Sequence, residues 1–460
     1  HIMNKLLLFS VVMLLGLSFV ACSSKDSENI ETLQQEVESL KPIVTATPRP
    51  TPTPTTAPTA IPINRESRQS LEAPTVEPTE PPKRRSDYEI SEVANLTHYP
   101  AMENCSGIGA VKQFLFSPLD PENISHIQPY GQVVGGHVTP IDHMYLALKD
   151  PFSGRDFYEV RAIYDGLIVD IGRRDISTET NQAQKSDWRV DIAHTCTFVS
   201  YLDLMTSLAP EIEANWLPTE GGQTGYWPGY PVKAGQVIGY IGEHALDFGV
   251  YDYEITLPGF INPSAYIDIE PWKVHTVDPF PYFPDLLRED LLAKMIRTVE
   301  PRAGKIDYDV QNALSGNWFE IGTNWYEGIN RQKYWEGHLS IHPNPIDPSL
   351  WIIAVGHLET ENNNFILIGN ADPAKPSVGL EPTRFQLRQY FTYIPAKPSL
   401  NWWNEPSIEG EVFGVKVFDE NKGTVLLEIP ETGTLKAEVF LDKAPEEVIA
   451  FTDSVRTYSR

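Results

Sequence analysis

The stretch Val160-Arg161-Ala162-Ile163-Tyr164-Asp165-Gly166-Leu167-Ile168 decides the fold class of the central part of this chain. It places β-branched and other apolar residues on both sides of the turn residues Asp165-Gly166, a pattern typical of short strands. Similar runs recur between residues 88 and 280, and few segments there show a helical period. The runs cover residues 132–134, 144–148, 160–171, 188–192, 198–202, 237–241 and 250–255. The sequence therefore predicts a β-rich domain over residues 88–280.

The pattern changes after residue 280. Leu287, Leu291 and Met295 share one helical stripe, which predicts a helix from residue 284 to 299 within a linking segment at 281–309. Residues 310–460 return to short strands, at 351–358, 364–368, 385–394, 412–417, 424–429, 435–440 and 448–458. About 150 residues of short strands suit a β-sandwich or a small barrel. We therefore expect a mainly β protein with two β domains joined by a helix.

The first 87 residues have a different composition. Lys5 precedes an apolar run from Leu6 to Val20, which predicts a signal peptide over residues 1–22. Apolar residues at heptad spacing predict a short helical segment over 23–41. Residues 42–87 form a linker, because the 41 residues from Pro42 to Pro82 include eleven Pro and nine Thr. Such a stretch cannot build a core and is expected to be extended.

The end of the predicted signal peptide resembles a lipobox. Phe19-Val20-Ala21-Cys22, followed by two serines, is similar to the lipidation motif of bacterial lipoproteins. The resemblance implies export, lipidation of Cys22, and anchoring to the bacterial cell membrane or the outer membrane. No later run of 18 apolar residues occurs, so we expect the protein to be anchored and not to span the membrane.

Charge excludes one class of partner. The 460 residues carry 36 basic and 62 acidic side chains, for a net charge of −26. Residues 1–85 contain nine of each, so the whole excess lies in residues 86–460. A chain this acidic repels polyanions, which excludes binding through nucleic-acid backbones.

Two cysteines remain after the predicted signal peptide. Cys105 and Cys196 would stand in a compartment that permits disulfides. They are also compatible with two small buried hydrophobic residues, and both alternatives stay open. The oligomeric state stays open as well.

Three separated segments carry the candidate chemistry. They are residues 135–143, residues 190–204, and residues 231–254. Their His and Asp side chains supply the nitrogen and oxygen ligands of a divalent metal, and alternate residues of a strand project onto one face. A site requires these distant segments to converge.

In this order the segments resemble the lysostaphin-type zinc endopeptidases, which cut peptidoglycan cross-bridges. Val160 to Ile168 is similar to the family's V-x-A-x-x-D-G-x-V strand pair, and Val232 to Gly239 to its V-x-x-G-Q-x-I-G motif. The resemblance covers roughly residues 130–270. It implies an antiparallel β domain, a zinc or other divalent metal, and peptidoglycan or an envelope protein as partner.

The resemblance places the family's metal ligands on His137, Asp142 and, as an Asp in place of His, Asp252. Asp203 stands where the family's Y-x-H-L motif has its catalytic His, and both proton-handling histidines are missing. His143, His194 and His244 are the imidazoles left, and we take His194 and Asp203 as candidate catalytic residues. The domain is then a divergent metalloendopeptidase or a non-catalytic relative that binds the cell wall, and both alternatives stay open.

The last domain carries a second motif. Gly316-Asn317-Trp318 resembles the G-x-W of lipocalin-like barrels, in which a late Arg packs over the Trp. Arg456 or Arg460 is expected in that role, and such a barrel could carry an apolar ligand at the envelope. The other interpretation, a β-sandwich whose tryptophans serve packing, is the one we favour from the sequence.

Overall fold

The computed structural model describes residues 104–134, 136–176, 185–215, 217–218, 225–226, 229–358 and 363–460. The predicted signal peptide, helical segment and linker, with Cys22, lie outside these residues. The described residues belong to one compact unit that is mainly β, as predicted. No helix among them is both long and apolar enough to cross a membrane.

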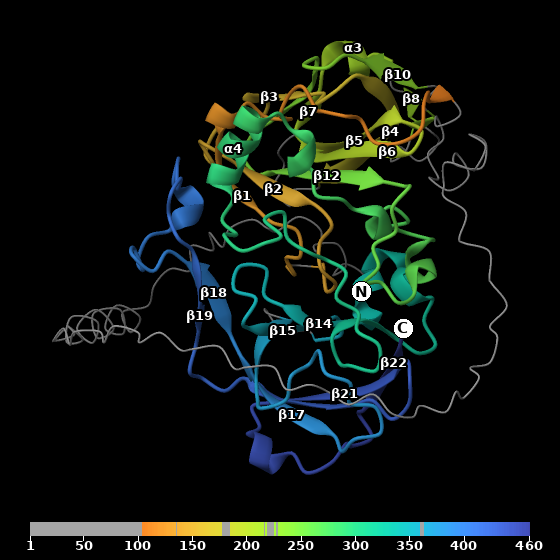
Figure 1. Cartoon of the computed structure of the whole chain (residues 1–460), viewed down its shortest axis with the longest axis vertical. Helices are drawn as coiled ribbons and strands as arrows, with labels where there is room; N and C mark the ends of the chain where they lie inside the picture. Colours follow the sequence, from red (N-terminus) through yellow and green to blue (C-terminus); the bar gives the residue numbers. More distant parts are fainter. Residues whose placement is uncertain are drawn as a thin grey trace, which may run out of the picture. The chain divides into compact units, whose positions relative to one another are not determined.

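The larger sheet of the central region has seven described strands, and every neighbouring pair is antiparallel. The order is β1-β2-β12-β6-β5-β4-β10, and Figure 1 shows its middle strands side by side. The strands are β1 (Ile124–Gln128), β2 (Met144–Leu148), β4 (Gly166–Ile176), β5 (Lys185–Thr195), β6 (Phe198–Met205), β10 (Tyr230–Val232) and β12 (Leu246–Asp252).

A smaller sheet packs on the apolar face of the larger one. It consists of β3 (Tyr158–Arg161), β11 (Val237–Ile241) and β7 (Ser207–Leu208) in the order β3-β11-β7. Val160, Ile238 and Leu208 from it share one core cluster with Ile168, Ile192 and other residues of the larger sheet. Helix α3 (Pro210–Glu213) and the pair β8 (Leu217–Pro218) and β9 (Gly225–Tyr226) complete this region.

The structure corrects one prediction for this region and decides one question that the sequence left open. Residues 132–134 form no strand, and Val134 makes only an isolated bridge with His137. Cys105 and Cys196, for which both alternatives were open, are joined by a disulfide.

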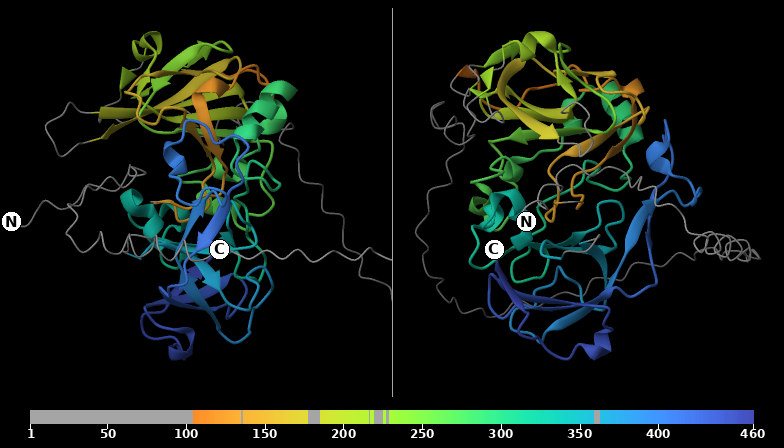
Figure 2. Two further views of the ribbon diagram at one scale, coloured as in Figure 1. Left: turned by 90° about the vertical axis from the view of Figure 1, so that its left-hand side faces the viewer. Right: turned by 180° about the vertical axis from the view of Figure 1, so that it is seen from behind.

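The predicted linking helix exists and is shorter than expected. Helix α4 (Asp285–Lys294) ends because Met295 is extended and forms a bridge with Ile127 of β1. Leu291, buried on the helix, joins the central core. Figure 2 shows α4 beside β1, which agrees with their contacts.

The last domain is a closed barrel of eight antiparallel strands, so the β-sandwich that the sequence favoured is wrong. Each strand pairs with the next one along the barrel, and the last pairs with the first. Closure leaves no free edge, whereas a sandwich would leave several. The strands are β13 (Gly316–Glu320), β14 (His338–Pro343), β15 (Trp351–Val355), β16 (Asn364–Ile368), β17 (Thr383–Arg388), β20 (Gly423–Glu428), β21 (Thr434–Leu441) and β22 (Arg456–Ser459).

Side chains fill the interior of the barrel. Trp318, Leu339, Ile353, Leu387 and Val425 belong to one buried cluster to which all eight strands contribute. The expectation of a late Arg over the Trp is confirmed for Arg460, whose guanidinium carbon lies 3.9 Å from the centre of the Trp318 ring. Arg456 instead pairs with Glu320.

A hairpin extends from the barrel toward the central region. Strands β18 (Tyr390–Tyr393) and β19 (Gly414–Val417) pair with each other and continue β17 and β20. Residues beyond its tip reach α4 and β1, since Glu409 pairs with Lys294 of α4 and the Trp402 ring lies 5.1 Å from that of His126. Phe319 and Tyr326 also belong to the central core cluster. The two domains therefore share buried side chains.

Candidate functional site

Polar side chains line one face of the larger sheet. Across the strands, Asp203 of β6 pairs with Asp247 of β12, and Tyr201 pairs with Asp191 of β5. Paired residues of neighbouring strands point to the same side, so these groups share the face opposite the apolar core. Asp191, Asp203 and Asp247 are all buried. We call Asp142, His143, Asp203, Asp247, Arg174, Glu270 and Lys273 the polar cluster.

His143 lies between two carboxylates. Its Nδ1 is 3.5 Å from Oδ1 of Asp142, and its Nε2 is 3.3 Å from Oδ2 of Asp247. Burial lowers the pKa of His143, but Asp247 and Asp142 outweigh this effect and leave the pKa above its usual value. The two acids therefore favour the protonated imidazole, and we call His143 a resident cation of the cluster.

Lys273 is the second resident cation. Its side chain is 1 % exposed, and its Nζ lies 3.7 Å from Oδ1 of Asp142 and 3.4 Å from Oε2 of Glu270. Burial would raise the pKa of Asp142, but Lys273 and His143 hold it below its usual range. Burial raises the pKa of Glu270, whose Oε2 also accepts a 2.6 Å hydrogen bond from the Tyr326 hydroxyl.

Asp203, the candidate catalytic residue, accepts four hydrogen bonds, two at each side-chain oxygen. Arg174 donates to both oxygens, at 2.8 Å and 2.5 Å, the Tyr201 hydroxyl donates at 2.7 Å, and the backbone N–H of Leu204 donates at 2.6 Å. Burial would raise the pKa of Asp203, but Arg174 reverses the shift. A carboxylate held this way stays ionised and does not exchange protons readily near neutral pH.

His194 lies on the other face of the sheet. Its ring nitrogens lie 3.0 Å from the carbonyl oxygen of Asp165 and 2.9 Å from the hydroxyl of Ser200. Burial lowers the pKa of His194 to about 4. Because Ser200 and Asp203 differ by an odd number of residues on β6, they point to opposite faces. The structure thus separates the two candidate catalytic residues, and His194 is a hydrogen-bonded core residue.

The predicted metal ligands are only partly brought together. The His137 ring lies 6.0 Å from the ring of His143, and it is His143 that contacts Asp142. Asp252 follows Tyr251, whose hydroxyl is 3.3 Å from Oδ2 of Asp142, so on β12 Asp252 points to the opposite face. Its Oδ1 accepts from the backbone N–H of Glu254.

Sequence reasoning missed Asp247, the acid of β12 that does face the cluster. The predicted strand began at Val250, whereas β12 begins at Leu246. Asp247, Gly249 and Tyr251 lie on one face of the strand, so a strand predicted to begin at Leu246 would have placed Asp247 beside the cluster. Arg174 and Lys273 carry no such pattern, because Arg174 lies near the end of β4 and Lys273 begins the short 3-10 helix Lys273–His275.

The donor set does not fit the predicted metal. His143 and Lys273 already lie against Asp142, and Arg174 occupies both oxygens of Asp203. In the part of the chain that the structure describes, no group of three or more His, Cys, Asp or Glu side chains is arranged to hold a metal ion. Resident cations balance these carboxylates where a metal would otherwise do so.

Comparison with known proteins adds no relative. The chain matches no protein-family model, no curated protein and no solved structure.

Proposed function

We propose that this protein is an envelope-anchored lipoprotein whose central domain is a non-catalytic relative of the lysostaphin-type endopeptidases. It acts by binding the cell wall or an envelope protein. The anchor and the family rest on sequence motifs: the lipobox at Cys22, the Pro/Thr linker and the two scaffold motifs.

One observation carries the choice of binding over hydrolysis. Asp203, at the position of the family's catalytic His, is held by Arg174, Tyr201 and the backbone of Leu204. Hydrolysis by a metallopeptidase needs a bound metal that activates water and a group that transfers protons. The polar cluster leaves no carboxylate open to a metal, since its acids lie against resident cations. Asp203, held ionised by Arg174, does not take the place of the family's catalytic His as a proton carrier.

The proposal is tested by incubating the purified protein with insoluble peptidoglycan and Zn²⁺, Mn²⁺ or Ca²⁺. We expect co-sedimentation that survives a chelator, and no release of soluble peptides with any of the three ions. The matched control is Asp142→Ala, which removes a predicted ligand. Metal-dependent release of peptides that disappears in Asp142→Ala would show that the domain is an enzyme.

The envelope carrier of apolar ligands has less support. Its barrel exists, but buried side chains from all eight strands occupy the interior, including Trp318 and Leu387. A carrier of this size instead keeps an open cavity among its inward-facing residues. We therefore do not assign this function to the barrel.

A further inference from the structure

Two turns lie against each other at one end of the polar face. The turn between β2 and β3 runs from residue 149 to 157, and the turn between β11 and β12 includes residues 242–245. The backbone N–H of Phe157 donates to the carbonyl of Ile241, and a Cβ on Gly242 would lie 1.9 Å from the carbonyl oxygen of Gly154. We call residues 150–157 and 242–245 the rim.

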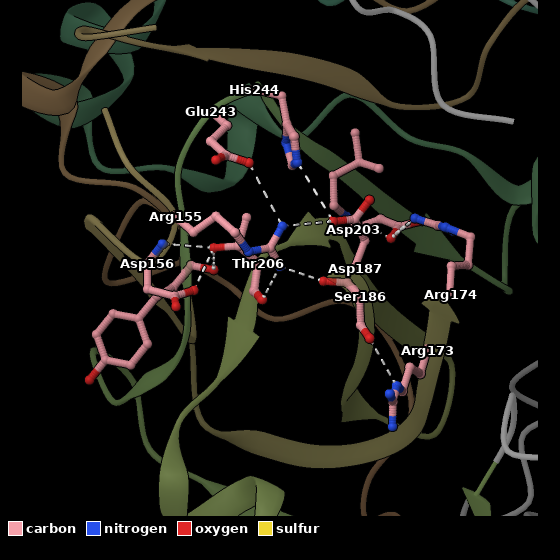
Figure 3. A network of polar contacts seen from close by, with 12 residues as sticks. Arg155, Asp156, Arg173, Arg174, Ser186, Asp187, Asp203, Thr206, Glu243 and His244 are labelled. Carbon is pink, nitrogen blue, oxygen red and sulfur yellow. Dashed lines mark hydrogen bonds and ion pairs between the residues drawn. The ribbon is translucent and has the colours of Figure 1, made fainter. Parts of the chain in front are cut away.

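A buried carboxylate beneath the rim has no hydrogen-bond partner. Asp187 of β5 is 0 % exposed, and neither of its oxygens is hydrogen-bonded. Its nearest basic groups are Nη1 of Arg155 at 4.0 Å and Nε2 of His244 at 3.7 Å, both beyond hydrogen-bond distance. Figure 3 shows Glu243 and His244 on one side of the Arg155–Asp187 contact.

Arg155 does not neutralise this carboxylate well. Its Nη2 is anchored on the carbonyl oxygens of Ser186, at 2.6 Å, and Thr206, at 2.7 Å. A buried ionised group without a hydrogen bond is costly and keeps a strong local field. The exposed acids Asp150, Asp156 and Glu243 add to this field, and Glu243 shares Nη1 of Arg155 with Asp187, at 3.8 Å and 4.0 Å (Figure 3). Lys149 and Arg155 stand against these four carboxylates at the rim. The rim therefore has a surplus of negative charge.

The same rim exposes apolar surface. Phe152 is 70 % exposed and Phe157 is 63 % exposed. Two exposed aromatic rings beside a surplus of acids suit a partner that combines apolar and cationic groups, because aromatic faces also attract cations. The His244 side chain, which is 25 % exposed, lies against the buried Asp187.

We propose that the rim is a docking surface for a basic peptide segment with apolar side chains, which belongs to a partner protein. Phe152 and Phe157 contact the apolar side chains, Glu243 meets the ammonium groups, and Asp187 attracts them from below as a positioning residue. This inference does not rest on the proposed function, because none of these residues belongs to the polar cluster.

The test uses the purified full chain and a fluorescein-labelled peptide of alternating Lys and Leu, with binding followed by fluorescence anisotropy. We expect binding that weakens with salt, as surface charge requires. Phe152→Ser with Phe157→Ser lowers the affinity by about tenfold or more, and Glu243→Gln lowers it several-fold, as expected for contact residues. We expect Asp187→Asn to weaken binding as well. If that variant does not fold, Phe152→Ser with Phe157→Ser, and Glu243→Gln, test the proposal without it.

Two matched controls lie on the barrel. Glu446→Gln removes another exposed acid, and Ile449→Ser removes an apolar side chain that is 82 % exposed. We expect both to bind as the unchanged protein does. Equal losses in the controls, equal binding of a Glu/Leu peptide, or no loss in the rim variants would each overturn the proposal.

Discussion

The barrel and the larger sheet are both antiparallel, yet they bury opposite kinds of side chain. The barrel encloses apolar residues such as Trp318, Leu339 and Ile353. The polar face of the larger sheet instead buries Asp203 and Asp247 among resident cations. In an apolar interior, the cost of a substitution follows the buried volume that it removes. In a buried charge network, the loss of one partner leaves another charge unpaired. The two regions should therefore respond differently to single substitutions.

The largest effect is expected for Lys273→Met. Removal of the ammonium leaves Asp142 and Glu270 buried without their shared cation, which costs about 3–5 kcal/mol of unfolding free energy. Urea denaturation followed by fluorescence measures the loss. Lys273→Met with Asp142→Asn should recover much of it, because the unpaired charge is then gone. A double variant no more stable than the single one would contradict the charge argument.

Removal of the disulfide comes next. Cys105 and Cys196 close a loop with a sequence separation of 91 residues. Cys105→Ser with Cys196→Ser should cost about 2–4 kcal/mol, largely by freeing the unfolded chain. Calorimetry under non-reducing conditions measures it. Because Phe319 and Tyr326 share the central core, we expect one lowered transition. A separate, unchanged barrel transition would show that the two domains unfold independently.

A smaller effect is expected at the closure of the barrel. Arg460 stacks on Trp318 and donates to the carbonyl oxygens of Ser315, Val310 and Ala313. Arg460→Ala should cost about 2 kcal/mol, from the lost stacking and the unpaired carbonyls. Arg456→Ala is the control, since Arg456 pairs with the part-exposed Glu320 and should cost under about 1 kcal/mol. Equal losses would contradict a special role for Arg460.

The smallest effect concerns pH. Burial raises the pKa of Asp247 to about 7, while His143 opposes the shift. The folded protein then keeps a proton that the unfolded chain has released, so the contribution of Asp247 to stability falls as the pH rises from about 4 to about 7. In Asp247→Asn the fall between pH 5 and pH 7.5 should be smaller by about 1–2 kcal/mol. Parallel stability curves for the two proteins would contradict it.

Much of the fold could be predicted from local pattern. The ranges of β2, β11 and β16 were predicted to the residue, because apolar runs bounded by turn residues mark strands directly. The choice between a sandwich and a barrel could not be made this way. The barrel closes because β22 pairs with β13, and the lengths of strands in the sequence do not show which strands pair.

The candidate site was predicted less well. Asp142 and Asp203 were predicted as a metal ligand and a catalytic residue, and the structure brings both into the polar cluster, where each lies against a cation. Asp252 was chosen because the resemblance placed one of the family's metal ligands there, whereas Asp247 is the acid of β12 on the polar face. Lys273 and Arg174 escaped notice, since cations far apart in sequence show no spacing rule.

The sequence alone determined that this protein is acidic, mainly β, and divided into two β domains joined by a helix. Composition and periodicity record which residues are buried and in which kind of element. Only the tertiary structure decided what the buried acids do. A carboxylate becomes a metal ligand, a proton carrier or half of an ion pair according to what lies within about 4 Å of it, and Arg174, Lys273 and His143 reach Asp203, Asp142 and Asp247 only after folding.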